Sequence, residues 1–461
     1  MDLEKRARRQ SLRIIISEAI MVIAVAATVV VLAMVVSGYW LNSDFKVERQ
    51  GMLQINSVPT GAKVSVDGDA PWFQRTNTSK VLSGGEHEVV LSKDGYDTWS
   101  KTVNVKEGLL YRLNYPYLFL KERYKESVYD TTTATFATVS PNHKLMLLAN
   151  NTTKWELVDL DSDQIKPSVV DVSKVFSIAS PLSETEVGLF KGEILSAEWD
   201  GANEHVLFKV RMEDGIKWVL LDVKNVSKSV NLTREFAAEF NTVDIFDYSA
   251  DNLLVTRGGN LHKIDVNSRQ ISAILISDIV NFDYYESEIV YATKDSVFFR
   301  RLSSDEPTLV TATSDKTQVL ISKFYDEKYI YIIEGINVSI FKKESLEKAA
   351  SFKLGFIPEA VKAGYGGEFI IMTAGDKIAT LDMEAMQVRE WATGSVDYGW
   401  LNQYMVYAVK DGELSAYDFD GFNHRVLAAN VSHRFPATIT SEKWLYYFSD
   451  DELIREWLIA R

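Results

Sequence analysis

Six histidines and two short aspartate runs are the residues of this chain whose types could support catalysis or hold a metal. The histidines are His87, His143, His205, His262, His424 and His433, and none has another histidine at metal-ligand spacing. The sequence contains neither a Gly-x-Ser-x-Gly turn nor a glycine-rich phosphate loop. It therefore predicts no catalytic residues, no metal site and no cofactor, and it leaves the ligand-binding residues unidentified.

The first aspartate run matches part of a calcium-binding loop. Asp159, Asp161 and Asp163 have the spacing of its first three ligands, but the glycine and the bidentate glutamate that the loop needs are both missing. The turn at Asp418 and Asp420 is a similar partial match. Both runs are better explained as turns at the ends of strands, where an aspartate accepts hydrogen bonds from backbone amides.

The elements that carry these residues form a repeat. Eight apolar six-residue runs begin at Lys144, His205, Asn252, Glu288, Lys328, Glu368, Gln403 and Lys443. A polar turn and a second run follow each one, and the second runs end at Asp159, Asp222, Asp265, Arg301, Lys342, Asp382, Asp418 and Trp457. These end points are 63, 43, 36, 41, 40, 36 and 39 residues apart. A period near forty, with β-branched and aromatic runs in each unit, predicts a β-propeller.

The repeat count favours eight blades over residues 125–461. The long first gap leaves seven as the alternative, if residues 166–196 contain half a blade instead of a loop or an outer strand. The eighth unit ends without an outer strand, and the stretch from Ser127 to Thr131 is placed to supply it. We expect the ring to close in this way, because an open ring would expose a strand edge at each end.

Two segments resemble known families. Ser140-Pro141-Asn142-His143-Lys144, followed by the strand end at Asp159, resembles the repeat of TolB-like and WD-related propellers. Upstream, residues 53–68, LQINSVPTGAKVSVDG, resemble the opening of a PEGA domain, with Pro-Thr-Gly-Ala in place of Pro-Glu-Gly-Ala. The first resemblance implies a fold, and the second implies a bacterial or archaeal extracytoplasmic module that binds surface proteins or wall polymers.

Periodicity alone predicts a small β-sandwich over residues 51–120. Apolar residues alternate in four short stretches, at Leu53 and Ile55, Val64 and Val66, Val89 and Leu91, and Val103 and Val105. Alternation with a period of two is typical of strands with one buried and one polar face.

The N-terminal region predicts a membrane anchor. The stretch from Ala19 to Val36 carries no charge, and with Ile14 it defines a transmembrane helix over residues 14–37. A basic tail, residues 1–13, precedes it, and Tyr39 and Trp40 follow at the expected outer interface. The alternative is a cleaved signal peptide ending near Ser37, although its apolar stretch would be unusually long. The anchor places the N-terminus in the cytoplasm and the bulk of the chain outside the cell membrane.

Composition agrees with this placement. The chain has no cysteine, so disulfides and thiolate metal sites are excluded. The net charge is −14, of which the first thirteen residues contribute +3, so the remaining chain is strongly acidic. An acidic surface argues against nucleic acid as a partner.

Two classes of function remain open. The first is a non-catalytic, membrane-anchored binding or scaffold protein that presents a propeller to a protein or a cell-envelope glycan. The second is an extracytoplasmic enzyme acting on polysaccharide or peptide, with carboxylates brought to the central channel from different blades. A pair of carboxylates about 5 to 10 Å apart and flanked by aromatic residues would favour the enzyme.

Overall fold

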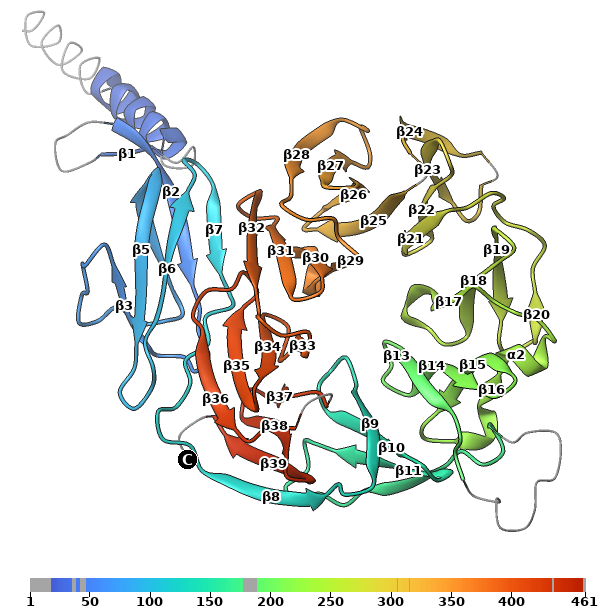
Figure 1. The fold of residues 1–461 in the computed structure, drawn as a ribbon. Helices are drawn as coiled ribbons and strands as arrows, with labels where there is room; N and C mark the ends of the chain where they lie inside the picture. The colour runs from blue at the N-terminus through green and yellow to red at the C-terminus, as the bar shows by residue number, and fades with distance from the viewer. Residues whose placement is uncertain are drawn as a thin grey trace, which may run out of the picture. The chain divides into compact units, whose positions relative to one another are not determined.

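The chain divides into two compact units, Met1–Lys121 and Glu122–Arg461 (Figure 1). The structure is a computed structural model, and the residues it describes are 18–34, 39–41, 47–176, 189–304, 306–314, 316–432 and 435–458. Each unit is described separately below.

Unit 1 contains two sheets. Its strands are β1 (Tyr39–Leu41), β2 (Val47–Ile55), β3 (Lys63–Val66), β4 (Thr78–Ser83), β5 (Gly85–Ser92), β6 (Trp99–Val105) and β7 (Leu110–Leu113). One sheet has the order β1-β2-β4 with β7 parallel to β2, and the other has the order β3-β5-β6. The predicted alternation is confirmed, because the eight alternating residues from Leu53 to Val105 are all buried. Their side chains fill the core of the unit.

A helix over residues 18–34 precedes these strands. The sequence predicted a transmembrane helix over residues 14–37, but within the described part of the chain no helix is long and apolar enough to cross a membrane. Of the predicted anchor residues, Ala19 lies in the helix, whereas Ile14 and Val36 lie outside the described residues. Tyr39 and Trp40 belong to β1, where they pair with Arg49 and Glu48 of β2.

In unit 2, the described residues form eight four-stranded antiparallel sheets. Sheets 1 to 4 are β9 (Ala134–Val139), β10 (Leu145–Asn150), β11 (Lys154–Asp159) and β12 (Ser168–Asp171); β13 (Glu193–Trp199), β14 (His205–Met212), β15 (Gly215–Asp222) and β16 (Val230–Asn231); β17 (Thr242–Ile245), β18 (Asn252–Arg257), β19 (Asn260–Asp265) and β20 (Gln270–Ile271); and β21 (Asn281–Tyr285), β22 (Glu288–Ala292), β23 (Ser296–Arg301) and β24 (Thr308–Ala312).

Sheets 5 to 8 continue the pattern. They are β25 (Thr317–Phe324), β26 (Glu327–Glu334), β27 (Asn337–Lys342) and β28 (Lys348–Lys353); β29 (Ala360–Ala363), β30 (Phe369–Ala374), β31 (Lys377–Asp382) and β32 (Gln387–Ala392); β33 (Tyr398–Trp400), β34 (Met405–Lys410), β35 (Glu413–Asp418) and β36 (Arg425–Ala429); and β37 (Thr438–Thr440), β38 (Trp444–Ser449), β39 (Glu452–Trp457) and β8 (Lys125–Asp130). The short helices α2 (Leu232–Glu235), η1 (Val226–Lys228), η2 (Phe246–Tyr248) and η3 (Tyr365–Gly367) lie in connections.

The sheets follow one another around a ring in chain order, with the first strand of each on the inner side (Figure 1). The predicted apolar runs form the second strand of every sheet, and all eight predicted end points are the last residues of the third strands. The all-β, propeller-like class is therefore confirmed. Residues 166–196, in the long first gap, contain β12, the outer strand of sheet 1, and the start of β13; residues 177–188 among them lie outside the described residues.

The predicted turn chemistry is also present. Asp159, Asp222, Asp265 and Asp382 each accept a hydrogen bond from the backbone N–H of a residue two or three positions later. His143 has a φ of 58°, in the left-handed region that favours glycine. Its imidazole Nδ1 lies 2.7 Å from Thr438 Oγ1 of sheet 8, a contact that links the first and last sheets.

The core of unit 2 lies between successive sheets. One buried cluster joins Leu147 and Trp155 of sheet 1 to Phe208 of sheet 2, and further clusters join later neighbours. Another cluster packs Met146 of sheet 1 against Tyr446 of sheet 8. As predicted, the strand before the first repeat completes the last sheet, because β8 pairs with β39.

Candidate functional site

Three inner strands on neighbouring sheets each carry a carboxylate. Glu198 lies near the end of β13, and Asp244 and Asp283 are the third residues of β17 and β21. A cation, Lys362, is the third residue of the inner strand β29. These strands lie at the inner edge of the ring, so residues far apart in the chain converge there (Figure 1).

Asp283 has a structural role in this group. Its Oδ2 accepts a hydrogen bond of 2.8 Å from the backbone N–H of Ile321, and Asn281 accepts one of the same length from Val319. Both bonds link β21 to β25 of the next sheet. Burial raises the pKa of Asp283 to about 7, and the charge of Asp244 adds to the effect.

A structural role of this kind does not explain the presence of Glu198 and Asp244 at the inner edge. Burial raises the pKa of Asp244 to about 6, and the hydroxyl of Thr242 is the side chain that opposes the shift. Burial, followed by the charge of Asp244, raises the pKa of Glu198 to about 7, while Lys362 acts in the opposite direction. Neither carboxylate forms an ion pair with any residue that the structure describes. Glu198 nevertheless remains accessible to solvent.

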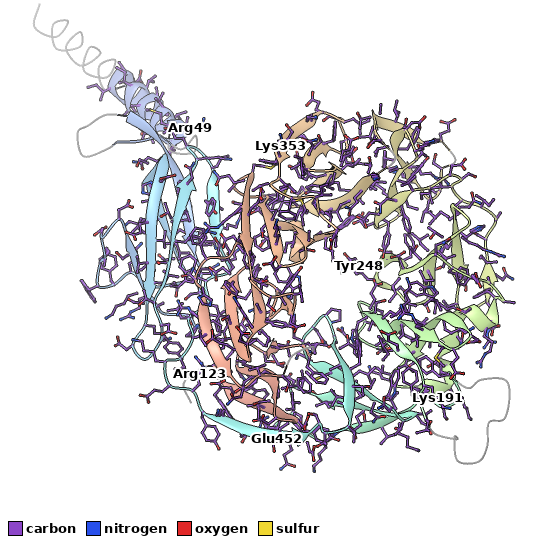
Figure 2. All side chains as sticks on the ribbon, in the orientation of Figure 1. Arg49, Arg123, Lys191, Tyr248, Lys353 and Glu452 are labelled. Carbon is purple, nitrogen blue, oxygen red and sulfur yellow. The ribbon has the colours of Figure 1, made fainter. Side chains whose placement is uncertain are left out.

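Two tyrosines accompany the carboxylates. The hydroxyl of Tyr284 donates a hydrogen bond to the carbonyl oxygen of Ile245, which joins β21 to β17. Tyr248 lies on the inner side of the ring, and its side chain is 68% exposed (Figure 2). The N–H of Gly201 bonds to the carbonyl of Tyr248 at 2.8 Å, and a Cβ on Gly201 would lie 2.8 Å from the Tyr248 Cβ. Glycine at this position therefore allows the loop after sheet 2's first strand to approach Tyr248.

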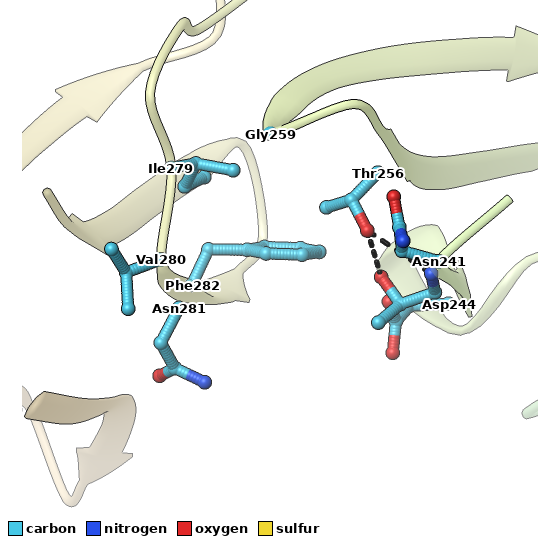
Figure 3. Close-up of a pocket in the computed structure, with 9 residues that line it drawn as sticks. Asn241, Asp244, Thr256, Gly259, Ile279, Val280, Asn281 and Phe282 are labelled. Atoms are coloured by element: carbon cyan, nitrogen blue, oxygen red, sulfur yellow. Dashed lines mark hydrogen bonds between the residues drawn. The ribbon is translucent and has the colours of Figure 1, made fainter. Parts of the chain in front are cut away.

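A cavity of about 430 Å³ opens between β17 and β21. Its lining is mixed, with Asn241, Thr242, Asp244 and Thr256 on one side and Ile279, Val280, Asn281 and Phe282 on the other (Figure 3). A second cavity, of about 260 Å³, lies between β29 and β33 and is lined by Lys362, Tyr398 and Trp400 among mainly apolar residues. Concave sites with few polar groups are typical of ligand binding.

The histidines considered in the sequence analysis lie elsewhere, in structural positions. His87, His205 and His424 contact Asp67, Asp200 and Ser415 at 2.6, 2.8 and 3.0 Å, and His262 contacts the Ser272 carbonyl at 3.1 Å. His433 lies outside the described residues. Within the described ranges, no three His, Cys, Asp or Glu side chains are grouped as they would be around a metal ion.

The aspartate runs are turns. Asp161 forms an ion pair of 2.8 Å with Lys144, and Asp418 accepts a hydrogen bond of 2.8 Å from Asn423. The inner-strand carboxylates were not singled out from the sequence. A signal was nevertheless present, since Glu198, Asp244 and Asp283 each stand between two apolar or aromatic residues shortly before one of the predicted runs.

The two units together define an all-β chain in which a small sandwich precedes a propeller-like ring of sheets. Residues 50–117, within the first unit, match the PEGA domain family. Comparison with curated proteins gave no match.

Three solved structures to which the chain is similar are a WD40 domain, a bacterial surface component and Hsv2. The C-terminal WD40 domain of Sif2 has a TM-score of 0.46 at 10% identity and covers 74% of this chain and 99% of its own. PorZ of Porphyromonas gingivalis, a surface component of the type-IX secretion system, has a TM-score of 0.43 at 12% identity, with coverage of 70% and 42%. Hsv2 of Kluyveromyces lactis has a TM-score of 0.42 at 9% identity, with coverage of 65% and 98%. None of these likenesses bears on function.

Proposed function

We propose that the chain is a non-catalytic, membrane-anchored binding or scaffold protein, whose eight sheets are the blades of a closed propeller. The observation that carries the proposal is the convergence of Glu198, Asp244 and Tyr248 on Tyr284, whose pKa burial and the charges of all three raise, with Asp244 in the lining of the cavity between β17 and β21. Uncompensated buried charge lowers the stability of an isolated chain, and carboxylates with strongly raised pKa values cluster at functional sites. The partner is a protein or a cell-envelope glycan.

Residues 14–37 are proposed to hold the chain in the cell membrane, with the N-terminus in the cytoplasm. The apolar side chains of the helix over residues 18–34 are exposed on all sides, for example Ile20 at 61%, Ile23 at 67% and Val30 at 58%. Exposed apolar surface of this extent favours a lipid environment. The basic tail before it favours the cytoplasmic side.

The placement can be tested by labelling, because the chain has no cysteine of its own. Lys5→Cys and Asp94→Cys each introduce one thiol. In intact cells, a membrane-impermeant maleimide should label the Asp94→Cys variant and leave the Lys5→Cys variant unlabelled until the membrane is opened. Labelling of both or of neither in intact cells would contradict the placement.

The binding function is tested by crosslinking in native membranes with the full chain as bait. Recovery of one stoichiometric protein, or retention of one wall polysaccharide, is expected. If the full chain recovers no stoichiometric protein from membranes and retains no wall polysaccharide, the result contradicts the proposal.

The enzyme remains a second candidate because of one observation. Burial and the charge of Asp244 raise the pKa of Glu198, and the pKa values of about 7 for Glu198 and about 6 for Asp244 would let one hold a proton while the other is ionised near neutral pH. Such a pair can serve as general acid and base in glycoside hydrolysis. Release of reducing ends from a wall polysaccharide, abolished by Glu198→Gln, would establish this candidate in place of the first.

A further inference from the structure

The cavity between β17 and β21 has one strong acceptor in its lining. The amide oxygen of Asn241 is engaged by the N–H of Gly258 at 3.2 Å, and that of Asn281 by the N–H of Val319 at 2.8 Å. The hydroxyls of Thr242 and Thr256 bond to each other at 2.9 Å (Figure 3). Asp244, by contrast, keeps acceptor capacity, because an ionised carboxylate offers about four lone-pair sites and a threonine hydroxyl fills only one.

The charge around Asp244 is negative. Glu198 and Asp283 are both close enough to Asp244 for its charge to raise their pKa values. Lys362 is the cation that acts on Glu198, and it lies on β29, where it lines the other cavity. A positively charged group entering beside Asp244 would therefore relieve repulsion among three carboxylates.

The opposite wall suits the rest of a cationic side chain. Phe282 points from β21 across the cavity toward Thr256 and Asn241 (Figure 3). An aromatic face attracts ammonium and guanidinium groups, and Ile279 and Val280 offer apolar surface to an aliphatic stem. The amide NH2 groups of Asn241 and Asn281 can donate to backbone carbonyls of an extended peptide.

We propose that this cavity binds an arginine or lysine side chain of the protein partner. This inference rests on the proposed binding function and names the chemistry that recognises the partner. A metal ion is a poor alternative, since the described residues group no three suitable ligands there. A free polyamine would satisfy Asp244 but would leave the two asparagine amides without carbonyl partners.

The experiment uses the full chain in a nonionic detergent and two fluorescent, N-acetylated peptides, Gly-Arg-Gly-Arg-Gly and the same peptide with citrulline in place of each arginine. Citrulline keeps the shape and removes the charge. At pH 8 we expect the arginine peptide to bind at least about tenfold more tightly than the citrulline peptide, since hydrogen bonds to charged groups contribute this much or more.

Matched variants separate the cavity from the general acidity of the chain. Asp244→Asn should lower the affinity for the arginine peptide about tenfold. Asp326→Asn, an exposed aspartate in the turn between β25 and β26, removes the same charge and should leave the affinity unchanged. Thermal melting of both variants at pH 8 shows whether each is folded.

Three results would overturn the proposal: equal affinity for the two peptides, equal loss in the two variants, or no binding of the arginine peptide by the unmodified chain. The proposed binding function is judged by a different result, the crosslinking experiment. If Asp244→Asn still recovers the same crosslinked partner as the unmodified chain, the binding function stands and the cavity is not its contact site.

Discussion

Two groups of carboxylates in unit 2 have opposite electrostatic surroundings. Glu288, between sheets 4 and 5, is 4% exposed and contacts Lys343 at 2.8 Å, Lys328 at 3.0 Å and Arg301 at 3.3 Å. Burial by itself would raise its pKa, but hydrogen bonds from Lys343 and Lys328 outweigh burial and lower it. Glu198 and Asp244, at the inner edge of sheets 2 and 3, have raised pKa values and no such partners among the described residues.

This difference distinguishes a carboxylate that stabilises the fold from carboxylates that are available to bind a partner. Where two sheets meet away from the inner edge, a buried carboxylate is neutralised by lysines from the neighbouring sheet and holds the two together. At the inner edge, Glu198 and Asp244 have no ion-pair partner among the residues that the structure describes, which lowers stability and leaves binding capacity. A chain selected for stability alone would have no reason to keep Glu198 and Asp244 as acids.

The largest effect on stability is expected from removing the charge of Glu288, the carboxylate that is paired with lysines. Glu288→Gln should lower the free energy of unfolding by about 3 kcal/mol, because it leaves Lys343 buried without its main partner. The loss stays at the low end of the range for buried pairs since Lys343 also contacts Glu344 and Lys328 also contacts Glu286. Urea denaturation measures it.

The control for this variant is Glu327→Gln, which removes an exposed partner of Lys342. It should leave the urea midpoint unchanged. A loss below about 1 kcal/mol in Glu288→Gln would mean that the two groups differ less than their contacts indicate.

Neutralising Asp244 at the inner edge should change the free energy of unfolding in the opposite direction. Asp244→Asn removes a desolvated charge and should raise the free energy of unfolding at pH 8 by about 1 kcal/mol, after allowance for partial exposure. Urea denaturation at pH 8 and pH 5 checks the effect, since the gain should be smaller at pH 5, where Asp244 is largely protonated in the folded chain, and should disappear only below the pKa of the aspartate in the unfolded chain. A loss of stability at pH 8 would show that Asp244 is a structural residue.

The pH dependence of stability sharpens the same contrast. Asp244, Glu198 and Asp283 have folded pKa values of about 6, 7 and 7, above those of the unfolded chain, so the native state holds protons that the unfolded state has already lost between about pH 4 and 7. Their contribution to stability therefore falls as pH rises through this window and is constant above it. Glu288 contributes in the reverse direction, and its stabilisation is lost only as pH falls through its lowered pKa.

Urea titrations across this window should show a lower free energy of unfolding at pH 7.5 than at pH 5.5. In Asp244→Asn the slope should be shallower. A rising slope in the unmodified chain would mean that the inner carboxylates are compensated after all.

The smallest effect concerns Lys362. Lys362→Met removes the cation that opposes the upward shift of Glu198, so the pKa of Glu198 should rise further. Carboxyl carbon shifts of labelled glutamate, followed by NMR through the titration, would show the change. An unchanged midpoint would mean that Lys362 and Glu198 do not interact across the ring.

The sequence predicts the sheets well and the site poorly, for a physical reason. The second and third strands of each sheet are buried on both faces. Runs such as residues 288–293 are therefore visible in the sequence as apolar segments that recur, and so are strand ends such as Asp222 that follow them. First strands such as β17 and β33 are short and partly exposed, and they carry no such pattern. The site is built from these first strands.

Convergence adds a second obstacle. Glu198, Asp244 and Lys362 belong to three different repeats, and they meet only because the sheets turn about one axis. A single sequence contains no pattern that reports the angle between successive sheets. The raised pKa values likewise depend on what surrounds each carboxylate in space.

The pairing of β8 with β39 determines how the chain responds to mechanical load. Tension transmitted from unit 1 enters unit 2 at Glu122 and reaches β8 before any other strand. Because β8 is held by β39, through Asp130 opposite Glu452 and Ser127 opposite Ile454, that tension acts first on the backbone hydrogen bonds that join β8 to the last of the eight sheets. Under force this seam is the first part of the propeller-like unit expected to yield, and peeling β8 away would leave the inner edge of sheets 2 to 4 intact.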